Sequence, residues 1–163
     1  MVPERNVPTH VLLYGARVPE LDRVAAWAFL LRTHAAVVPK LERSLAPTGL
    51  PLSWYDVLLV LNAAPDRRLR MSELGAQAVI SRERVSRVVT ELAAAGLVER
   101  QDNPDDKRSV FAVITTEGRK RLRSAAPAYL DAVDSHFLSY LTETEARVIS
   151  TALRKVLEGE ERP

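Results

Sequence analysis

The most regular pattern of apolar and polar positions lies in the middle of the chain, between residues 71 and 115. A shorter helical pattern at residues 72–79 is followed by a second one at residues 81–95. Two runs that suit β-strands come next, at residues 97–101 and 109–115. The second helix is expected to bury one face, because four apolar residues recur in it at helical spacing: Val85, Val88, Val89 and Leu92.

The residues at the ends of these segments agree with that interpretation. Ser81 can cap the second helix by accepting a hydrogen bond from a backbone N–H, and Gly96 can end it in the left-handed conformation. The sequence DNPDDK at residues 102–107 is rich in turn formers and separates the two strands. The order helix, turn, helix, hairpin predicts a winged helix-turn-helix.

The segments before this region are mainly helical in pattern. Residues 21–46 carry an apolar stripe close to the coiled-coil period, and Pro39 is expected to bend or split that helix. Another helix is expected at residues 53–63, with Ser53 as its cap. Residues 65–69 predict a turn that can lead into a short third strand of the sheet.

Two more helices are expected after the hairpin. Residues 116–141 have a helical pattern with Pro127 inside it, where we expect a kink. Thr142 and Glu145 form the T-x-x-E pattern of a capping box, which opens a last helix that ends near Leu157.

Together these elements predict a mainly α fold with a small antiparallel β-hairpin wing, an α+β arrangement. We divide the chain into an N-terminal arm (1–19), a helical dimerisation region (20–50 and 116–163) and a winged helix-turn-helix domain (51–115). The terminal regions carry more apolar surface than the central domain can cover, and an exposed patch of that size disfavours a monomer. We therefore expect a two-fold homodimer.

Composition narrows the classes of protein that this chain can belong to. Of its 163 residues, 47% are hydrophobic and 27% charged, which suits a globular core. It has no cysteine, which excludes disulfides and thiolate metal sites. No apolar run approaches the length of a membrane span, and no signal peptide is visible, so we expect a cytoplasmic protein without membrane partners.

Charge is distributed unevenly, although the net charge is only +2. Residues 67–87 hold six basic residues against two acidic ones. The polar face of the second helix is part of this cluster and consists of Arg82, Glu83, Arg84, Ser86, Arg87 and Thr90. Arginine can bond guanine edges bidentately, and Ser or Thr can bond a base or a phosphate, so this face suits the major groove of DNA. The alternative is an ordinary solvated face of a surface helix.

The tip of the hairpin adds a second cationic feature. Lys107 and Arg108 follow the turn formers, and an arginine there can enter the minor groove of a duplex. The alternative is a hairpin that only covers the core, with Arg108 paired to Asp106.

Three stretches of the chain resemble one known family. Residues 106–115 (DKRSVFAVIT) resemble the wing signature of the MarR family of bacterial transcription regulators. Residues 72–100 (SELGAQAVISRERVSRVVTELAAAGLVER) are similar to that family's helix-turn-helix, and residues 115–122 (TTEGRKRL) to the start of its next helix. The resemblance extends over about residues 50–157.

The resemblance implies how DNA is bound. The helix at residues 81–95 would enter the major groove, Arg108 would reach the minor groove, and Asp106 would orient that arginine. The protein would be a homodimeric regulator, most simply a repressor, that binds double-stranded DNA at a near-palindrome with half-sites one helical turn apart. The DNA-binding set is Ser81, Arg82, Glu83, Arg84, Ser86, Arg87, Thr90, Lys107, Arg108 and Ser109.

The sequence departs from the family pattern at three places. Val79 and Ile80 occupy a turn that often carries glycine, and Arg70 stands where Ser or Thr often caps the preceding helix. Glu83 and Arg84 replace small hydroxyl residues. A DNA sequence preference therefore cannot be transferred from other members.

The resemblance also implies release from DNA by a small aromatic or phenolic effector. Aromatic and polar residues on the expected helices suit such a ligand: Trp27, His34, Trp54, Tyr55 and Asp56. The alternative for the two tryptophans is a place in the core. The three scattered histidines have no metal-site spacing, and we expect neither a metal nor a cofactor.

An enzyme and a protein-interaction module are the two alternatives to a DNA-binding protein. The sequence has no Gly-rich phosphate loop, H-E-x-x-H, G-x-S-x-G or cysteine nucleophile, which argues against an enzyme. A winged helix that serves only as a protein-interaction module, without an operator, stays open as the alternative.

Overall fold

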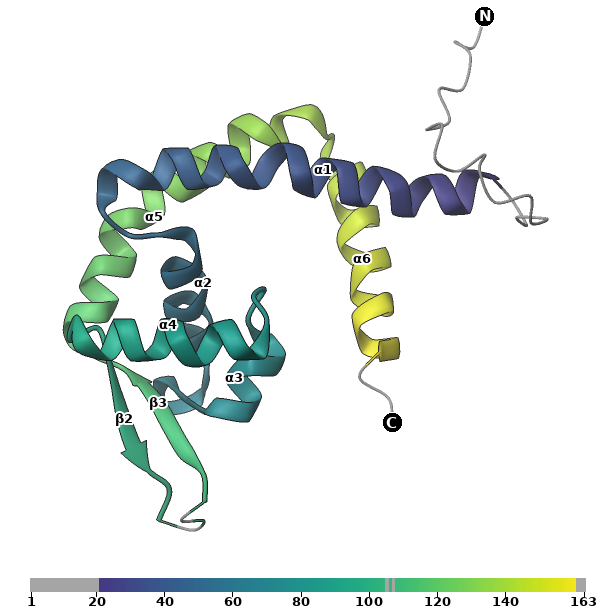
Figure 1. Cartoon of the computed structure of the whole chain (residues 1–163). Coiled ribbons are helices and arrows are strands. Elements are labelled where there is room, and N and C mark those ends of the chain that lie inside the picture. The colour runs from purple at the N-terminus through teal and green to yellow at the C-terminus, as the bar shows by residue number, and fades with distance from the viewer. Residues whose placement is uncertain (1–20, 105, 107, 161–163) are drawn as a thin grey trace, which may run out of the picture. The chain divides into compact units, whose positions relative to one another are not determined.

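The computed structural model describes residues 21–104, 106 and 108–160, with only the backbone described for residues 21–23 (Figure 1). The arm expected at residues 1–19 lies outside this range. The elements follow the expected order: α1 (Leu21–Leu45), η2 (Ala46–Thr48), α2 (Leu52–Ala63), η3 (Pro65–Arg67), β1 (Arg68–Arg70), α3 (Met71–Gln77), α4 (Arg82–Ala94), β2 (Val98–Asp102), β3 (Val110–Ile114), α5 (Thr116–His136), η4 (Leu138–Tyr140) and α6 (Glu143–Glu160).

The chain divides after Lys40 into two units, and α1 runs across the boundary. The described part of the first unit is α1 up to Lys40. Pro39 lies inside α1, which continues through it as one helix, so of the two expected outcomes the split does not occur. Within the described residues, no helix is long and apolar enough to span a bilayer.

The second unit contains a three-stranded antiparallel sheet in the order β1-β3-β2. Leu69 of β1 pairs with Ala112 of β3, and Val98 of β2 pairs with Ile114 of β3. The short strand suggested by residues 65–69 is therefore the third strand of the sheet. The fold is mainly α with a small antiparallel sheet, as predicted.

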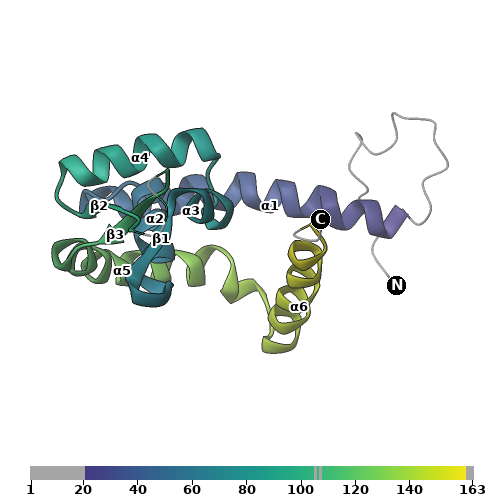
Figure 2. The ribbon, with the colours of Figure 1, turned by 90° about the horizontal axis from the view of Figure 1, so that it is seen from below.

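Helix α2 lies at the centre of the second unit, with α4 and α5 on opposite sides of it (Figure 2). We call residues 52–114, from α2 to β3, the central lobe. Its core is one cluster of buried side chains from the α-helices and β-strands of the lobe. Buried residues from the segments on either side of the lobe complete this cluster. The largest fully buried ones are Leu45, Leu50, Leu58, Leu61, Leu74, Leu92, Val57, Val85, Val89 and Val98.

Helix α2 begins one residue earlier than predicted. Pro51 is its N-cap residue, no side chain caps it, and Ser53 lies inside the helix. The predicted cap at Ser53 is therefore wrong. The fixed φ of proline suits the start of a helix, so Pro51 can begin α2 without a polar cap.

The C-terminal helices α5 and α6 lie closer to the predictions made from the sequence. Helix α5 bends along its course, and Pro127 lies inside it (Figure 1). Near its start, Gly118 is so close to the carbonyl of Leu97 that a Cβ atom would collide with it. The predicted capping box is present: the backbone N–H of Thr142 donates to Glu145 at 2.8 Å, and its hydroxyl accepts from the N–H of Glu145 at 3.3 Å.

Candidate nucleic-acid interface

Helix α4 turns one face into the core and the other to solvent. Its inner face confirms the predicted apolar seam, because four residues there are at most 3% exposed: Val85, Val88, Val89 and Leu92. Its outer face carries the polar residues that the sequence singled out, all of them exposed: Arg82, Glu83, Arg84, Ser86, Arg87 and Thr90.

The two ends of α4 are fixed as the sequence predicts. The hydroxyl of Ser81 accepts a hydrogen bond from the backbone N–H of Arg84 at 3.4 Å. Gly96 adopts a left-handed conformation with φ of 71° and turns the chain toward β2. In the first turn, the backbone N–H of Glu83 and the Ser81 hydroxyl hold the pKa of the Glu83 carboxyl below its ordinary value. The carboxylate is thus ionised at the positive end of the helix dipole.

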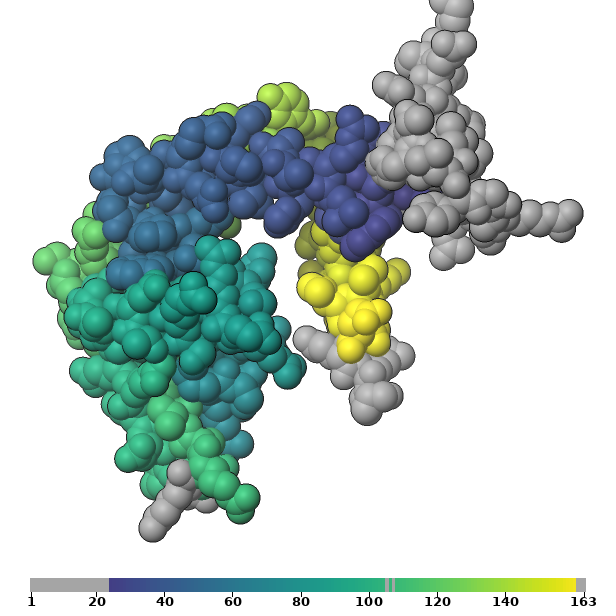
Figure 3. Space-filling model, viewed as in Figure 1, coloured from purple at the N-terminus to yellow at the C-terminus, as the bar shows by residue number. Residues whose placement is uncertain are grey.

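The arginines of this surface are available to an outside anion. Among the residues that the structure describes, ion pairs join Arg68 to Asp66 and Lys120 to Glu117. Within the same residues, no carboxylate pairs with four exposed arginines of α4 and the wing turn: Arg82, Arg84, Arg87 and Arg108. In the space-filling view, α4 and the wing strands lie exposed on one side of the second unit (Figure 3).

Arg100 of β2 joins the wing to α4 and was not among the predicted site residues. Its guanidinium donates to the hydroxyl of Thr90 at 2.8 Å and to the backbone carbonyl of Ser86 at 3.4 Å. The signal for it was present in the sequence. Side chains two apart on a strand share a face, so Arg100 lies on the same face as the buried Val98, where α4 packs.

The wing turn is held by a network around Asp106. The carboxylate of Asp106 accepts a hydrogen bond from the backbone N–H of Arg108 at 3.0 Å. The backbone carbonyl of Asp106 accepts one from the backbone N–H of Ser109 at 2.9 Å. Asn103 is buried, and its side-chain amide donates to the hydroxyl of Ser109 at 2.7 Å. Asp106 thus fixes the main chain at Arg108 and leaves the guanidinium exposed. Lys107 lies outside the described residues.

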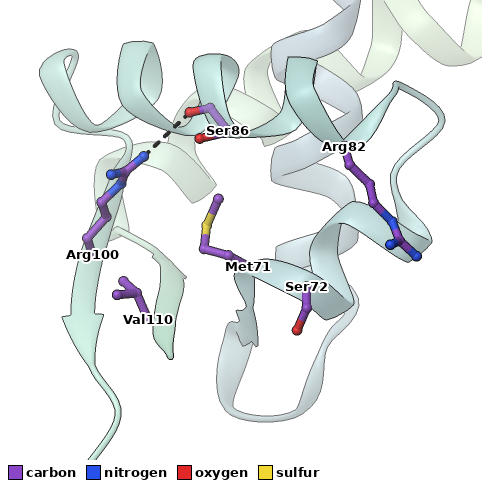
Figure 4. Close-up of a pocket in the computed structure, with 6 residues that line it drawn as sticks. All are labelled: Met71, Ser72, Arg82, Ser86, Arg100 and Val110. Carbon is purple, nitrogen blue, oxygen red and sulfur yellow. Dashed lines mark hydrogen bonds between the residues drawn. The ribbon is translucent and has the colours of Figure 1, made fainter. Parts of the chain in front are cut away.

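A hollow of about 370 Å³ is lined by residues of α3, α4 and the sheet (Figure 4). In Figure 4, Met71 points into this space, and Arg100 reaches across it from β2 to Ser86. Two arginines and two serines contribute to its lining beside the apolar Met71 and Val110. Its lining residues are Met71, Ser72, Arg82, Ser86, Arg100 and Val110.

The residues suggested for an effector fall in different parts of the chain. Trp27 and His34 are exposed and belong to the first unit, whereas Trp54, Tyr55 and Asp56 are consecutive on α2 in the second. The indole N–H of Trp54 donates to Glu91 of α4 at 3.0 Å. A carboxylate oxygen of Asp56 accepts from the backbone N–H of Val79 at 2.9 Å.

Tyr55 is buried, and its ring stacks on Tyr129 of α5 with 4.4 Å between the ring centroids. Burial is the main cause that raises the pKa of each of these tyrosines above its ordinary value. Burial also raises the pKa of Asp56, against the opposing effect of the hydrogen bond from Val79. All three residues of α2 therefore already have partners within the second unit.

Comparison with known proteins gives a consistent result. A sequence model of the MarR family matches residues 48–109. The transcriptional repressor Mb2911 of Mycobacterium bovis is 31% identical over 127 residues, which cover 78% of this chain and 89% of the relative. The repressor YetL of Bacillus subtilis is 28% identical over 103 residues, and the chain spans only 62% of its length.

The solved structures include one with DNA. Sco3205 of Streptomyces coelicolor, a MarR family transcriptional regulator crystallised in complex with DNA, is 34% identical to this chain. It superposes with a TM-score of 0.79 over 90% of this chain and 92% of its own.

Proposed function

Because the chain belongs to the MarR family of transcriptional regulators, we propose that it represses transcription as a homodimer bound to a near-palindromic operator. The observation that carries this proposal is the exposed face of α4, whose arginines have no acidic partner among the described residues. A surface of that kind is the electrostatic footprint of a duplex-binding protein.

Within this proposal, α4 lies in the major groove. Arg82, Arg84 and Arg87 contact guanine edges or phosphates, and the hydroxyls of Ser81, Ser86 and Thr90 contact phosphates or bases. Glu83 is the one acidic group in this set. A carboxylate accepts hydrogen bonds and is repelled by phosphates, so Glu83 restricts which bases can lie opposite it.

The wing supplies the second contact. Arg108 enters the minor groove, Asp106 holds the turn that carries it, and Lys107 and Ser109 flank it. Arg100 keeps the wing against α4 through Thr90. The two contacts are therefore presented to the duplex at a fixed separation.

The dimer is proposed to form through residues 20–50 and 116–163. Helix α6 carries large apolar side chains that are exposed in the single chain: Val148 at 61%, Leu153 at 37%, Val156 at 60% and Leu157 at 65%. Apolar surface of this extent on one helix favours a partner. A two-fold axis then places two α4 helices about 10 base pairs apart on the operator.

Release by a small aromatic effector is a further part of the proposal. Support comes from the aromatic and polar residues Trp54, Tyr55 and Asp56 on α2, the helix that contacts α4, and from Trp27 and His34 on α1. A ligand that displaced Glu91 from Trp54, or the backbone N–H of Val79 from Asp56, would remove contacts that hold α4 against α2.

The proposal is tested by selecting duplexes from a random-sequence pool with the purified protein. Binding of the selected duplex and of a random duplex is then titrated with salt. We expect tighter binding of the selected duplex, and an affinity that falls on a log–log plot with a slope of about −0.9 for each phosphate contact. Arg84→Ala should flatten the slope or relax the selectivity, whereas Arg123→Ala on the exposed surface of α5 is the control. Failure to enrich any sequence would contradict operator binding.

A further inference from the structure

The turn between α3 and α4 reverses the chain without a left-handed residue. Ala78 has φ of −71° and ψ of 146°, and Ser81 has φ of −61° and ψ of 153°, so both are extended. In the described part of the chain, the residues with positive φ lie elsewhere, and none is within residues 78–81. Backbone conformation alone therefore does not lock this turn, because extended residues tolerate a range of angles.

A long-range hydrogen bond adds a polar constraint to the packing of Ala78 and Ile80 against the core. The backbone N–H of Ala78 still bonds to Leu74 of α3, and that of Val85 bonds to Ser81. Between them, the N–H of Val79 donates to the Asp56 carboxylate of α2 at 2.9 Å. A residue 23 positions earlier in the sequence thus holds the middle of the turn.

Helix α2 is itself fixed in place. The ring of Tyr55, next to Asp56, is buried and stacked on Tyr129 of α5. Trp54 donates its indole N–H to Glu91, near the far end of α4. Three consecutive residues of α2 therefore contact α5, the far end of α4 and the turn that precedes α4.

The surroundings of Asp56 have two opposing effects on its carboxyl group. Burial raises its pKa, so the folded protein binds this proton more tightly than the unfolded chain does. The contribution of the Asp56 carboxyl to the free energy of unfolding is therefore greatest at low pH. It falls as the pH rises above the ordinary pKa of a carboxyl group, because burial disfavours the ionised form. At neutral pH burial therefore makes the ionised carboxyl less favourable to folding than the protonated one, and the hydrogen bond from Val79 opposes this effect.

We propose that Asp56 is a positioning residue for the DNA-reading helix: by holding the N–H of Val79, it sets the angle at which α4 presents Arg82 and Arg84 to the duplex. This inference rests on the proposed function. It predicts that loss of the acceptor impairs recognition of the operator and leaves the lobe folded.

The test compares three variants of the full chain. Asp56→Ala removes the acceptor, whereas Asp56→Asn keeps an oxygen that can accept from Val79 without the buried charge. Thr48→Val is the matched control, because it removes two partly buried hydrogen bonds, to Leu45 and from Leu50, away from α4. Each variant is measured by thermal unfolding, by amide hydrogen exchange at Val79, and by binding to the selected and random duplexes.

We expect Asp56→Ala to lose about tenfold or more in affinity for the selected duplex, which is the scale of one lost base contact. Its affinity for the random duplex should stay within about twofold, because the phosphate-contacting charges remain. The Val79 amide should exchange faster. Asp56→Asn should retain the selectivity and protection of the wild type, and Thr48→Val should lose stability with no change in the ratio of affinities.

Other outcomes distinguish a failure of the proposed function from a failure of the positioning role of Asp56. If the wild type selects no sequence, the proposed function fails and this inference fails with it. If the wild type is selective and Asp56→Ala keeps the same ratio of affinities, the positioning role is wrong and the proposed function stands. If Asp56→Ala does not fold, Asp56→Asn decides: loss of its selectivity with the Val79 amide still protected would contradict the role of the hydrogen bond.

Discussion

Asp66 and Arg67 both adopt left-handed backbone conformations in the turn between α2 and β1, with φ of 51° and 56°. The turn is closed by a hydrogen bond from the N–H of Arg67 to the carbonyl of Ala64 at 3.0 Å. Side chains with a Cβ atom are strained in this region, at a cost of about 1–2 kcal/mol for each residue. The two residues lie directly before β1, whose first residue Arg68 pairs with Val113 of β3.

Relief of that strain is a prediction for a single residue. Arg67→Gly should raise the free energy of unfolding by up to about 1 kcal/mol, since glycine adopts positive φ without a steric penalty. The gain is smaller than the strain itself because glycine makes the unfolded chain more flexible. Thermal unfolding measures it, with Arg67→Ala as the control for the lost charge. If Arg67→Gly and Arg67→Ala change the free energy of unfolding equally, the change comes from loss of the arginine side chain and not from relief of backbone strain.

A second prediction concerns the wing. Arg108→Ala should weaken operator binding by about 1 kcal/mol or more, because its exposed guanidinium is proposed to enter the minor groove. The thermal transition should not move, since the hydrogen bonds that hold the turn come from Asp106, Ser109 and the backbone. Arg123→Ala is again the control in a binding titration at low salt. Wild-type affinity in Arg108→Ala would show that the wing does not contact DNA.

The residue types predicted the exposed polar side chains and the ends of α4. They did not predict the long-range hydrogen bonds that hold α4 in place. Ser81 and Gly96 follow from local rules, because capping and left-handed termination involve only neighbouring residues. The bond from Val79 to Asp56 joins positions 23 residues apart, and no local pattern indicates it. Asp56 also belongs to the residues proposed for the effector, and that role stays a proposal beside its observed contact with the turn.

At the scale of an element, α4 shows how much an amphipathic pattern determines. Its four buried residues and its exposed arginines are on the faces that the sequence predicts. Helix α2 is less regular because it is buried between two other helices and apolar on several sides, so periodicity gave little information about its start. For this reason the predicted cap at Ser53 is wrong, and Pro51 is the N-cap residue.

The seam of α4 gives a prediction about folding. Val88→Asp should destabilise the protein by more than about 3 kcal/mol, because it places an unpaired carboxylate in the core. Circular dichroism and thermal unfolding measure the loss. Ala94→Asp, at an exposed position of the same helix, should change stability by less than about 1 kcal/mol. A folded Val88→Asp protein with a normal transition would show that the valine face is not buried in solution.

At the scale of the whole molecule, one chain does not cover its own apolar surface. Helix α6 has a regular apolar face, yet within the described residues none of its side chains is buried. The sequence predicted the helix and its capping box from local signals. Its partner could not be read from periodicity, because the same pattern describes packing within a chain and packing between chains.

The apolar face of α6 can be tested through the oligomeric state. Leu157→Glu should convert the proposed dimer to a monomer in light scattering, because a charge buried in an apolar interface is left without a partner. Helicity should be retained, since Leu157 is already 65% exposed in the single chain. Thr151→Glu, on the opposite side of α6, is the matched control. A dimeric Leu157→Glu protein would place the interface elsewhere.

The pairing of Leu69 with Ala112 has a consequence for synthesis of the protein. Strand β1 is translated before the two helices α3 and α4, and its partner β3 is translated after them. The sheet cannot close until the chain has emerged from the ribosome beyond Ile114, and the buried Leu122 of α5 emerges later still. A nascent chain that stalls before this point exposes the valine face of α4, and it is then a target for chaperones rather than a partly working regulator.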